Sequence, residues 1–418
     1  MPQARTPARQ YRGPQTPPTS LHGGVRDIGS AYCMHPAHDM STQTQVNTGA
    51  EPFVTRARRA ARSVGGALRT HYPGFIFGLP LARNAIPVFV YHDVDPTAFA
   101  SDLTFLRRNG YRTLGLEEFV SLSARKSGAP GRSVLLTFDD ARKNFFETAL
   151  PVLRDFQARA TLFAPTYWMR DTHQFMSWDQ IRTSLDTGLV DVQSHGHRHA
   201  LVLTSDRLLG FATPRALARY DIYDWPLRNT LAGAVSGRPL LGTPVYAATP
   251  LLSAARRYLE DPGVTAECVS HVERSGGAGY FDQTDALPRL RRLHARGASR
   301  SPGRFMCPGP FRSLLGSEFD LSREQFRRQL GFAPTHFAYP WMMGSSQSLE
   351  LAKQFGIQTV FGVALDYRRA RNPRLPVHAF GRLKADWLPL LPGEGRARFL
   401  SIAAAKVTGI SRTQHLAH

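Results

Sequence analysis

Residues 133–165 read SVLLTFDDARKNFFETALPVLRDFQARATLFAP. The apolar run at 134–138 predicts a buried strand that ends at two adjacent carboxylates, Asp139 and Asp140. Apolar residues at helical spacing follow, and a second strand is predicted over 160–164. Strand, helix and strand in this order form the βαβ unit of a parallel sheet. Because the carboxyl ends of parallel strands carry the chemistry of such folds, we expect the acid pair at a functional edge.

The same alternation of strands and helices continues along the chain. A strand over 189–193 is followed by SHGHRH at 194–199, and a strand over 335–339 runs into the dipeptide Pro-Trp. A helix that starts at Ser322 is predicted before the later strand, because serine often caps a helix N-terminus. The pattern predicts an α/β fold in which polar and aromatic residues follow several strand ends.

The 418 residues carry 52 Lys+Arg against 32 Asp+Glu, which gives a formal net charge of +20. A surface this basic favours anionic partners. One such partner is an anionic membrane surface, which the protein would contact peripherally. The chain has no basic motif interleaved with aromatic residues and no known recognition helix, so no specific nucleic-acid partner is predicted. Three scattered cysteines do not support a disulfide framework or a cysteine zinc cluster.

The sequence has no run of the ~20 apolar residues that span a bilayer. A secretory signal peptide is not recognisable at the N-terminus. We therefore expect a cytoplasmic protein, with any membrane contact peripheral. The oligomeric state is not predicted.

Domain organisation follows from shifts in composition. Residues 1–84 are interpreted as a disordered, basic N-terminal extension with one short helix over 54–68. The α/β domain covers 85–390, and 391–418 form a C-terminal tail. Within the domain, 206–317 interrupt the alternation of strands and helices, and a structureless loop of that length is unusual. We interpret this segment as an insertion on the side of the active site, with no fold assigned to it.

His195 and His199 are four residues apart, just after a predicted strand. In a tight turn this spacing allows both imidazoles to face one point, while Asp140 supplies an oxygen from another strand end. Two histidines and a carboxylate are a common ligand set for a catalytic divalent ion. Such an ion would offset the repulsion within the acid pair and leave Asp139 to accept a proton. His197 is an alternative ligand, but it points away if the other two histidines converge.

In combination, these motifs resemble a known family. TFDD after one strand, SHGHRH after the next and FAYPW after a later one are similar to motifs of the polysaccharide deacetylase family, the NodB-homology carbohydrate esterases of family 4. The earlier sequences IPVFVYHDV and FASDLTFLRRNGYRTLGLEEFV also resemble that family's first strand and helix. The resemblance runs over about 86–205 and again over about 318–385.

The resemblance implies a distorted (β/α) barrel, here with a large insertion between the second and third motifs. It implies a divalent metal ion, usually zinc, and hydrolysis of N-acetyl or sometimes O-acetyl groups on glycans. By position, Asp139 would be the catalytic base. Asp140, His195 and His199 would be the metal ligands.

The other implied site residues follow the later motifs. Tyr339, Pro340 and Trp341 would contact substrate, and the ion together with a backbone N–H near Tyr339 would stabilise the oxyanion. The family's late histidine, the general acid for the leaving amine, is best matched in order by His378. Arg382 is an alternative residue in the same region, where it would orient the base.

Two positions depart from the family pattern. Ala141 stands where the family often has a glycine after the acid pair, and Ala338 stands where many members have an arginine close to the base. One branch of the family also reads FAYP, so the second departure indicates a subtype.

The sequence thus predicts a metal-dependent hydrolase of non-peptide carbon–nitrogen bonds. Its expected substrate is an acetylated amino-sugar polysaccharide or a precursor, in cell-envelope or exopolysaccharide metabolism. Two alternatives remain: a hydrolase of another carbon–nitrogen bond, and a catalytically inactive glycan-binding protein.

Overall fold

The computed structural model describes residues 73–81, 85–124, 131–230, 233–362 and 378–402. Most of the predicted N-terminal extension, including its helix over 54–68, lies outside these residues. The end of the predicted C-terminal tail lies outside them as well.

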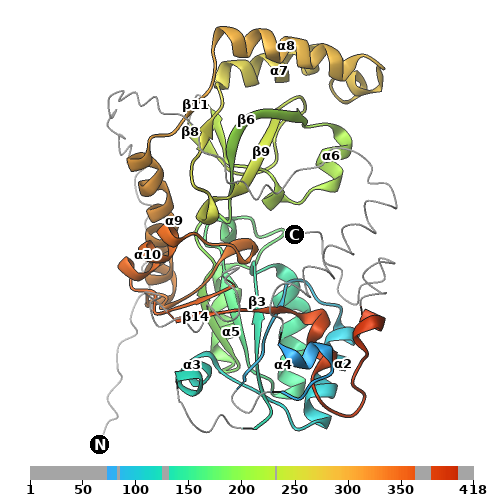
Figure 1. Ribbon diagram of the computed structural model, residues 1–418, viewed down its shortest axis with the longest axis vertical. Coiled ribbons are helices and arrows are strands. Elements are labelled where there is room, and N and C mark those ends of the chain that lie inside the picture. The colour runs from blue at the N-terminus through green and yellow to red at the C-terminus, as the bar shows by residue number, and fades with distance from the viewer. Residues whose placement is uncertain (1–72, 82–84, 125–130, 231–232, 363–377, 403–418) are drawn as a thin grey trace, which may run out of the picture. The chain divides into compact units, whose positions relative to one another are not determined.

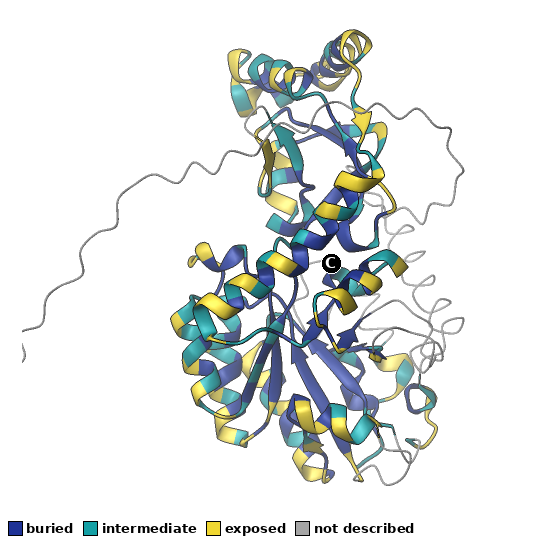
Figure 2. Ribbon diagram, turned by 90° about the vertical axis from the view of Figure 1, so that its left-hand side faces the viewer, coloured by how far each residue is buried: buried dark blue, intermediate teal, exposed yellow. Residues whose placement is uncertain are grey.

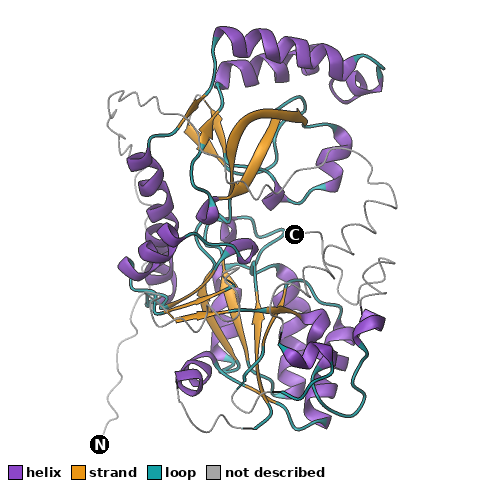
Figure 3. Ribbon diagram, viewed as in Figure 1, coloured by secondary structure: helices purple, strands orange, loops and turns teal. Residues whose placement is uncertain are grey.

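A curled parallel sheet forms the centre of the fold (Figures 1 and 3). Its strand order is β14-β13-β12-β5-β4-β3-β1-β15, with β2 paired to β3, and the pairings along this path are parallel. The predicted α/β fold class is therefore confirmed. The strands are β1 (Val88–Tyr91), β2 (Arg112–Thr113), β3 (Ser133–Phe138), β4 (Ala160–Ala164), β5 (Val190–Ser194), β12 (His336–Ala338), β13 (Thr359–Phe361), β14 (His378–Phe380) and β15 (Leu383–Lys384).

Helices connect the strands, as parallel pairing requires. Asp95 caps the first of them by accepting a hydrogen bond from the Ala98 N–H at 2.9 Å, and Ser177 with Gln180 forms a complete capping box on another. In Figure 2 the buried strands lie beneath helices whose outer faces are exposed. The helices are α2 (Pro96–Arg108), α3 (Leu116–Ala124), a π-helical turn η2 (Phe145–Ala149), α4 (Leu150–Phe156), α5 (Trp178–Asp186), α9 (Pro308–Leu330) and α10 (Ser346–Gln354).

Strand β3, the first strand of the opening sequence, is buried along its whole length. Its last residue, Phe138, stacks on Tyr91 with ring centroids 5.1 Å apart and meets Phe99 and Phe145 edge-on. Aromatic pairs in this geometry add to the energy of burial itself. The end of β3 is therefore held firmly in the core, one residue before Asp139.

The segment interpreted as an insertion has secondary structure of its own. Its antiparallel strands β6 and β9 pair with each other, and its helices α7 and α8 pack together. The elements are β6 (Leu201–Phe211), α6 (Pro214–Arg219), a 3₁₀ turn η4 (Ile222–Asp224), β7 (Arg228–Thr230), β8 (Gly233–Val235), β9 (Pro244–Pro250), β10 (Tyr258–Leu259), α7 (Pro262–Arg274), α8 (Ala286–Arg300) and β11 (Arg304–Phe305).

The predicted helix start at Ser322 is wrong. Helix α9 begins at Pro308, a residue suited to the first helical turn because it has no N–H to leave unpaired. Ser322 lies buried inside the helix, and its hydroxyl is 2.8 Å from the Ser194 hydroxyl. The expected insertion boundary between 317 and 318 consequently falls within α9.

In the described part of the chain, no helix is long and apolar enough to cross a membrane.

Replacing Leu136, which is fully buried in the centre of β3, tests the importance of this core. Leu136→Ala is expected to lower the free energy of unfolding by about 2–5 kcal/mol, because it removes buried methyl groups and leaves a cavity. Leu240→Ala, at a side chain that is 60% exposed, is the control and should change it by less than about 0.5 kcal/mol. Urea unfolding measures both, and equal effects would contradict the assignment of the core.

Candidate metal centre

Polar residues follow the carboxyl ends of strands β3 and β5, which are separated by β4, at one edge of the sheet. Asp139 and Asp140 come directly after β3, and His195 comes directly after β5. The carboxyl end of β12 lies beside that of β5, since Phe337 pairs with Ser194. The sheet thus gathers side chains that are far apart in the sequence.

Three of the predicted residues form a buried cluster. Candidate ligand atoms of Asp140, His195 and His199 all lie within 4.8 Å of one another. The Asp140 Oδ1 atom is 3.6 Å from Nε2 of His195 and 3.4 Å from Nε2 of His199. Two imidazole nitrogens and a carboxylate oxygen therefore converge on one point. This donor set suits a divalent transition-metal ion with an open coordination position.

A hydrogen bond fixes the tautomer of His195. Its Nδ1 is 2.8 Å from the Ala338 carbonyl oxygen. A carbonyl can only accept, so Nδ1 carries the proton and Nε2 presents its lone pair to the cluster. Burial also lowers the pKa of His195, although Asp139 opposes this effect. Burial thus favours the neutral imidazole that metal binding requires, and the hydrogen bond selects the tautomer with Nε2 free to coordinate.

Asp139 is held by Arg382 rather than by the cluster. The guanidinium donates from Nη1 to Oδ1 at 2.6 Å and from Nη2 to Oδ2 at 2.7 Å, with both side chains buried. Burial alone would raise the pKa of Asp139, but Arg382 and then His195 outweigh it, so the pKa lies below its usual value. Asp139 is thereby kept as an oriented carboxylate.

Asp140 has no such partner. Its Oδ1 is buried and makes no hydrogen bond. Burial raises the pKa of Asp140 to about 8; Asp139 adds to the increase and Arg142 opposes it. A buried oxygen without a donor, next to two imidazole nitrogens, fits a metal ion, which would supply the missing positive charge.

The loops at this edge adopt unusual backbone conformations. Among the described non-glycine residues, every positive φ except that of Gln157 occurs here, at Asp140, Ala141, His199, Trp341 and Met342. Such conformations concentrate at functional sites, where surrounding contacts impose them. Ala141, with a φ of 48°, occupies the position at which the family often has glycine, a residue that adopts this conformation without strain.

Glu318 holds the loop that carries both histidines. This carboxylate, buried in α9, accepts hydrogen bonds from the backbone N–H groups of His197 at 3.1 Å and Arg198 at 2.7 Å. It also accepts from Nη1 of Arg198 at 2.7 Å. Glu318 could not be predicted from the sequence, because its contacts span about 120 positions of the chain and no local motif marks it.

His197 takes no part in the cluster. Its Nδ1 is 2.9 Å from the Thr166 hydroxyl, and burial lowers the pKa of its imidazole to about 4. The alternative of His197 as a ligand is therefore not supported by its position.

The three predicted substrate contacts lie in different environments. The ring of Trp341 is partly exposed and its centroid is 4.2 Å from that of His199. Pro340 is buried. Tyr339 is buried too, with its hydroxyl accepting from Ser348 and its backbone N–H donating to the Phe361 carbonyl at 3.0 Å.

The prediction that Tyr339 contacts substrate is therefore not supported by the structure. Its buried side chain contacts Ser348 of α10, and its N–H is used in sheet hydrogen bonding. The expectation that its side chain contacts substrate does not agree with these contacts, and the N–H of Tyr339 itself already donates to Phe361.

The position of His378 does not agree with the prediction that it is the general acid. It is the first residue of β14, is exposed, and pairs with Thr359 at the start of β13. The amino ends of parallel strands lie at the opposite edge of the sheet from Asp139. The assignment of His378 as general acid therefore fails on position, and Arg382, two residues after β14 ends, is the residue of this motif that reaches the site.

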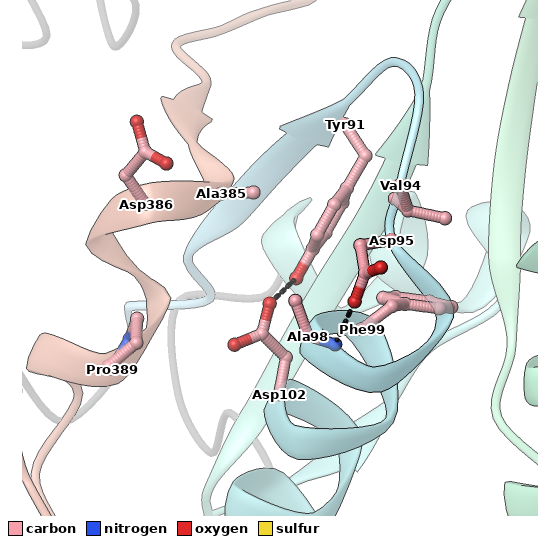
Figure 4. Close-up of a pocket in the computed structure, with 9 residues that line it drawn as sticks. All are labelled: Tyr91, Val94, Asp95, Ala98, Phe99, Asp102, Ala385, Asp386 and Pro389. Carbon is pink, nitrogen blue, oxygen red and sulfur yellow. Dashed lines mark hydrogen bonds between the residues drawn. The ribbon is translucent and has the colours of Figure 1, made fainter. Parts of the chain in front are cut away.

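A separate small cavity lies between β1, α2 and the 3₁₀ segment η9 (Ala385–Leu390). Figure 4 shows Tyr91 in its wall, donating a hydrogen bond to Asp102 at 3.1 Å. At about 20 Å³ it has room for a single water molecule. Its lining does not include the Asp–His cluster, so it is no part of the candidate site.

The fold and the site define the class of protein. It is an α/β protein with a buried cluster of one aspartate and two histidines at the carboxyl edge of a parallel sheet, next to an arginine-bound aspartate. Residues 126–216 match the family model described as polysaccharide deacetylase. These residues carry the TFDD and SHGHRH motifs, so this part of the chain is similar to the polysaccharide deacetylase family.

The curated proteins that match this chain have names that specify one kind of polysaccharide deacetylase. A poly-beta-1,6-N-acetyl-D-glucosamine N-deacetylase of Staphylococcus epidermidis is 32% identical over 115 residues, which cover 26% of this chain and 39% of the relative. A protein of the same name from Escherichia coli K12 is 25% identical over 119 residues, covering 25% of this chain and 18% of the relative. The chain thus spans less than two thirds of the length of the curated relatives that it matches.

Solved structures similar to this one include a de-N-acetylase from Aggregatibacter actinomycetemcomitans. The match has a TM-score of 0.46 and 17% sequence identity. It covers 76% of this chain and 99% of the chain of the solved structure. The match to IcaB from Ammonifex degensii has a TM-score of 0.43 and 18% sequence identity. It covers 79% of this chain and 100% of the IcaB chain.

Removing the Glu318 carboxylate tests how the histidine loop is held. Glu318→Ala is expected to lower the free energy of unfolding by about 3–5 kcal/mol, because Arg198 and two backbone N–H groups lose a buried acceptor. Asp320→Ala is the control on the same helix. Asp320 pairs with Arg323 at the surface and should contribute at most about 1 kcal/mol. Urea unfolding of both variants is the measurement, and similar losses would argue against this function of Glu318.

Proposed function

We propose that this protein is a metal-dependent hydrolase that removes N-acetyl groups from an amino-sugar polysaccharide. The observation that carries the proposal is the buried cluster of Asp140, His195 and His199 beside Asp139. The family match over the same motifs supports it, as do relatives whose names specify an N-deacetylase of poly-β-1,6-N-acetylglucosamine. That polymer is accordingly the first substrate to test.

In this proposal Asp140, His195 and His199 hold one divalent ion, with zinc as the expected metal. Such an ion, when bound, lowers the pKa of a water molecule and polarises the carbonyl under attack. Neutral His195 and the otherwise unpaired Asp140 oxygen are the donors that suit this role. His199 contributes Nε2 from the far end of the same loop.

Asp139 is proposed as the base that accepts a proton from the attacking water. Its Oδ2 lies 3.6 Å from Nε2 of His195, so the carboxylate borders the cluster without belonging to it. Arg382 holds both carboxylate oxygens and keeps Asp139 ionised. A fixed, ionised carboxylate can take a proton without first reorganising, which is how a positioned base accelerates hydrolysis.

Trp341 is proposed as a substrate contact. Its ring is partly exposed and lies beside His199, so it borders the space in which a sugar would approach the cluster. An aromatic face packs well against the apolar face of a sugar ring. Pro340, which is buried, contributes to this loop by fixing the backbone ahead of Trp341.

Replacing the proposed base gives the first test of function. Asp139→Asn is expected to lower the rate of acetate release from poly-β-1,6-N-acetylglucosamine by about 10²–10⁴-fold, while zinc still binds in one-to-one ratio. Asp186→Asn, at an exposed position at the end of α5, is the matched control and should keep wild-type activity. Acetate release and metal content are measured on the same preparations.

The outcomes of this test separate the alternatives. Turnover of an O-acetylated glycan or of another amide, with no release from the N-acetylated polymer, would leave a hydrolase with a different substrate. Glycan binding by a zinc-loaded wild-type protein without turnover of any of these substrates would identify a binding protein and contradict the proposal.

Removal of the metal tests whether the proposed hydrolase depends on a bound ion. Dialysis against a strong chelator should abolish acetate release, and addition of zinc should restore it, since the cluster provides all three protein ligands. Asp140→Ala should not bind zinc in one-to-one ratio and should not recover. Full activity after complete removal of the metal, verified by elemental analysis, would exclude a metal-dependent reaction.

A further inference from the structure

The 3₁₀ turn η4 brings an aromatic ring from outside the family motifs to the candidate metal centre. Tyr223 is buried, with 1% of its surface exposed, and its ring centroid is 4.0 Å from that of His199 at an interplanar angle of 30°. Its ring also contacts Trp168 edge-on at 5.5 Å and Phe175 at 5.6 Å. Tyr223 is therefore fixed by the core on one side and contacts a proposed metal ligand on the other.

Asp221 anchors the same turn to the loop that follows the acid pair. Its Oδ1 accepts a hydrogen bond at 2.7 Å from Nη2 of Arg142, and each side chain is only 11% exposed. Asp221 also organises the turn itself. It accepts from the Tyr223 N–H at 3.3 Å, and its own N–H donates to Asp224 at 2.9 Å.

Arg142 connects the turn 221–224 to the loop that carries Asp140. It lies two residues after Asp140, and its guanidinium carbon lies 4.9 Å from the Phe175 ring centroid and 5.0 Å from that of Tyr223. A cation over aromatic rings with a carboxylate partner is held in one place at low exposure. The turn 221–224 thus touches the metal centre at two points, through His199 and through the loop of Asp140.

His199 depends on such support. Its backbone is in the left-handed region at a φ of 48°, where a non-glycine residue is strained. A ligand in a strained loop binds a metal well only if neighbouring groups hold its ring in the required orientation. Contacts of this kind behind metal ligands typically change metal affinity by about 10–100-fold.

We propose that Tyr223 is a positioning residue for the metal ligand His199, and that Asp221 sets Tyr223 in place by holding Arg142. The segment interpreted as an insertion thereby completes the metal centre. This inference rests on the proposed function only in taking Asp140, His195 and His199 as the metal ligands.

Zinc affinity of the full-length protein is the test, measured by competition with a chromophoric chelator. Tyr223→Leu, which removes the ring, is expected to weaken zinc binding by about 10–100-fold. Tyr223→Phe, which keeps the ring, should stay close to the wild-type affinity. Tyr220→Leu is the matched control, because this nearby tyrosine has its ring against Trp225 instead of His199.

Asp221→Asn provides an independent variant that leaves the aromatic core intact. It is expected to weaken zinc binding by at least about tenfold, because the charge that fixes Arg142 beside Asp140 is removed. Thermal unfolding of each metal-free variant separates a change in zinc binding from a loss of the fold. If Tyr223→Leu does not fold, Asp221→Asn decides the question.

Unchanged zinc affinity in folded Tyr223→Leu, or an equal loss in Tyr220→Leu, would overturn the inference. Wild-type affinity in folded Asp221→Asn would overturn the part assigned to Asp221 and, where Tyr223→Leu does not fold, the whole inference. These results are distinct from a failure of the proposed function. In that case wild-type protein binds zinc with no acetate release, and the variants still report on His199.

Discussion

Two adjacent carboxylates buried at the end of a core strand are the constraint on which the rest of the site depends. Asp139 and Asp140 are 4% and 1% exposed, and like charges so close in a medium of low polarity repel strongly. The fold compensates for one with a cation, since Arg382 binds both oxygens of Asp139. It places the other beside two imidazole nitrogens, a donor set that compensates its charge when a metal ion joins it.

Much of the site could be predicted from the sequence, because its central residues sit next to strands. Asp140 follows β3, and His195 and His199 follow β5, and these strands belong to a run of consecutive strand–helix units with only β4 between them. Consecutive parallel units of this kind usually lie close together in a sheet, so their carboxyl ends meet. The chemistry of these residue types then indicates a divalent ion.

The late motif shows where such reasoning stops. His378 and Arg382 are only four residues apart, but His378 begins β14 and Arg382 follows its end, and a strand advances about 3.3 Å per residue. Order along the chain could not reveal which of the two leaves the carboxyl end. Glu318 and Tyr223 were not predicted at all, since their contacts with the histidine loop depend on tertiary packing that no local pattern records.

The division of work between the two carboxylates is the central claim, and a crystal structure of the zinc-loaded protein with anomalous diffraction at the zinc edge tests it most directly. We predict one strong peak at about 2.0–2.2 Å from Nε2 of His195, Nε2 of His199 and an oxygen of Asp140. Asp139 should still be paired with Arg382 and should not coordinate the ion. A peak that is bound by Asp139 in place of Asp140, or that lies away from both histidines, would contradict the account.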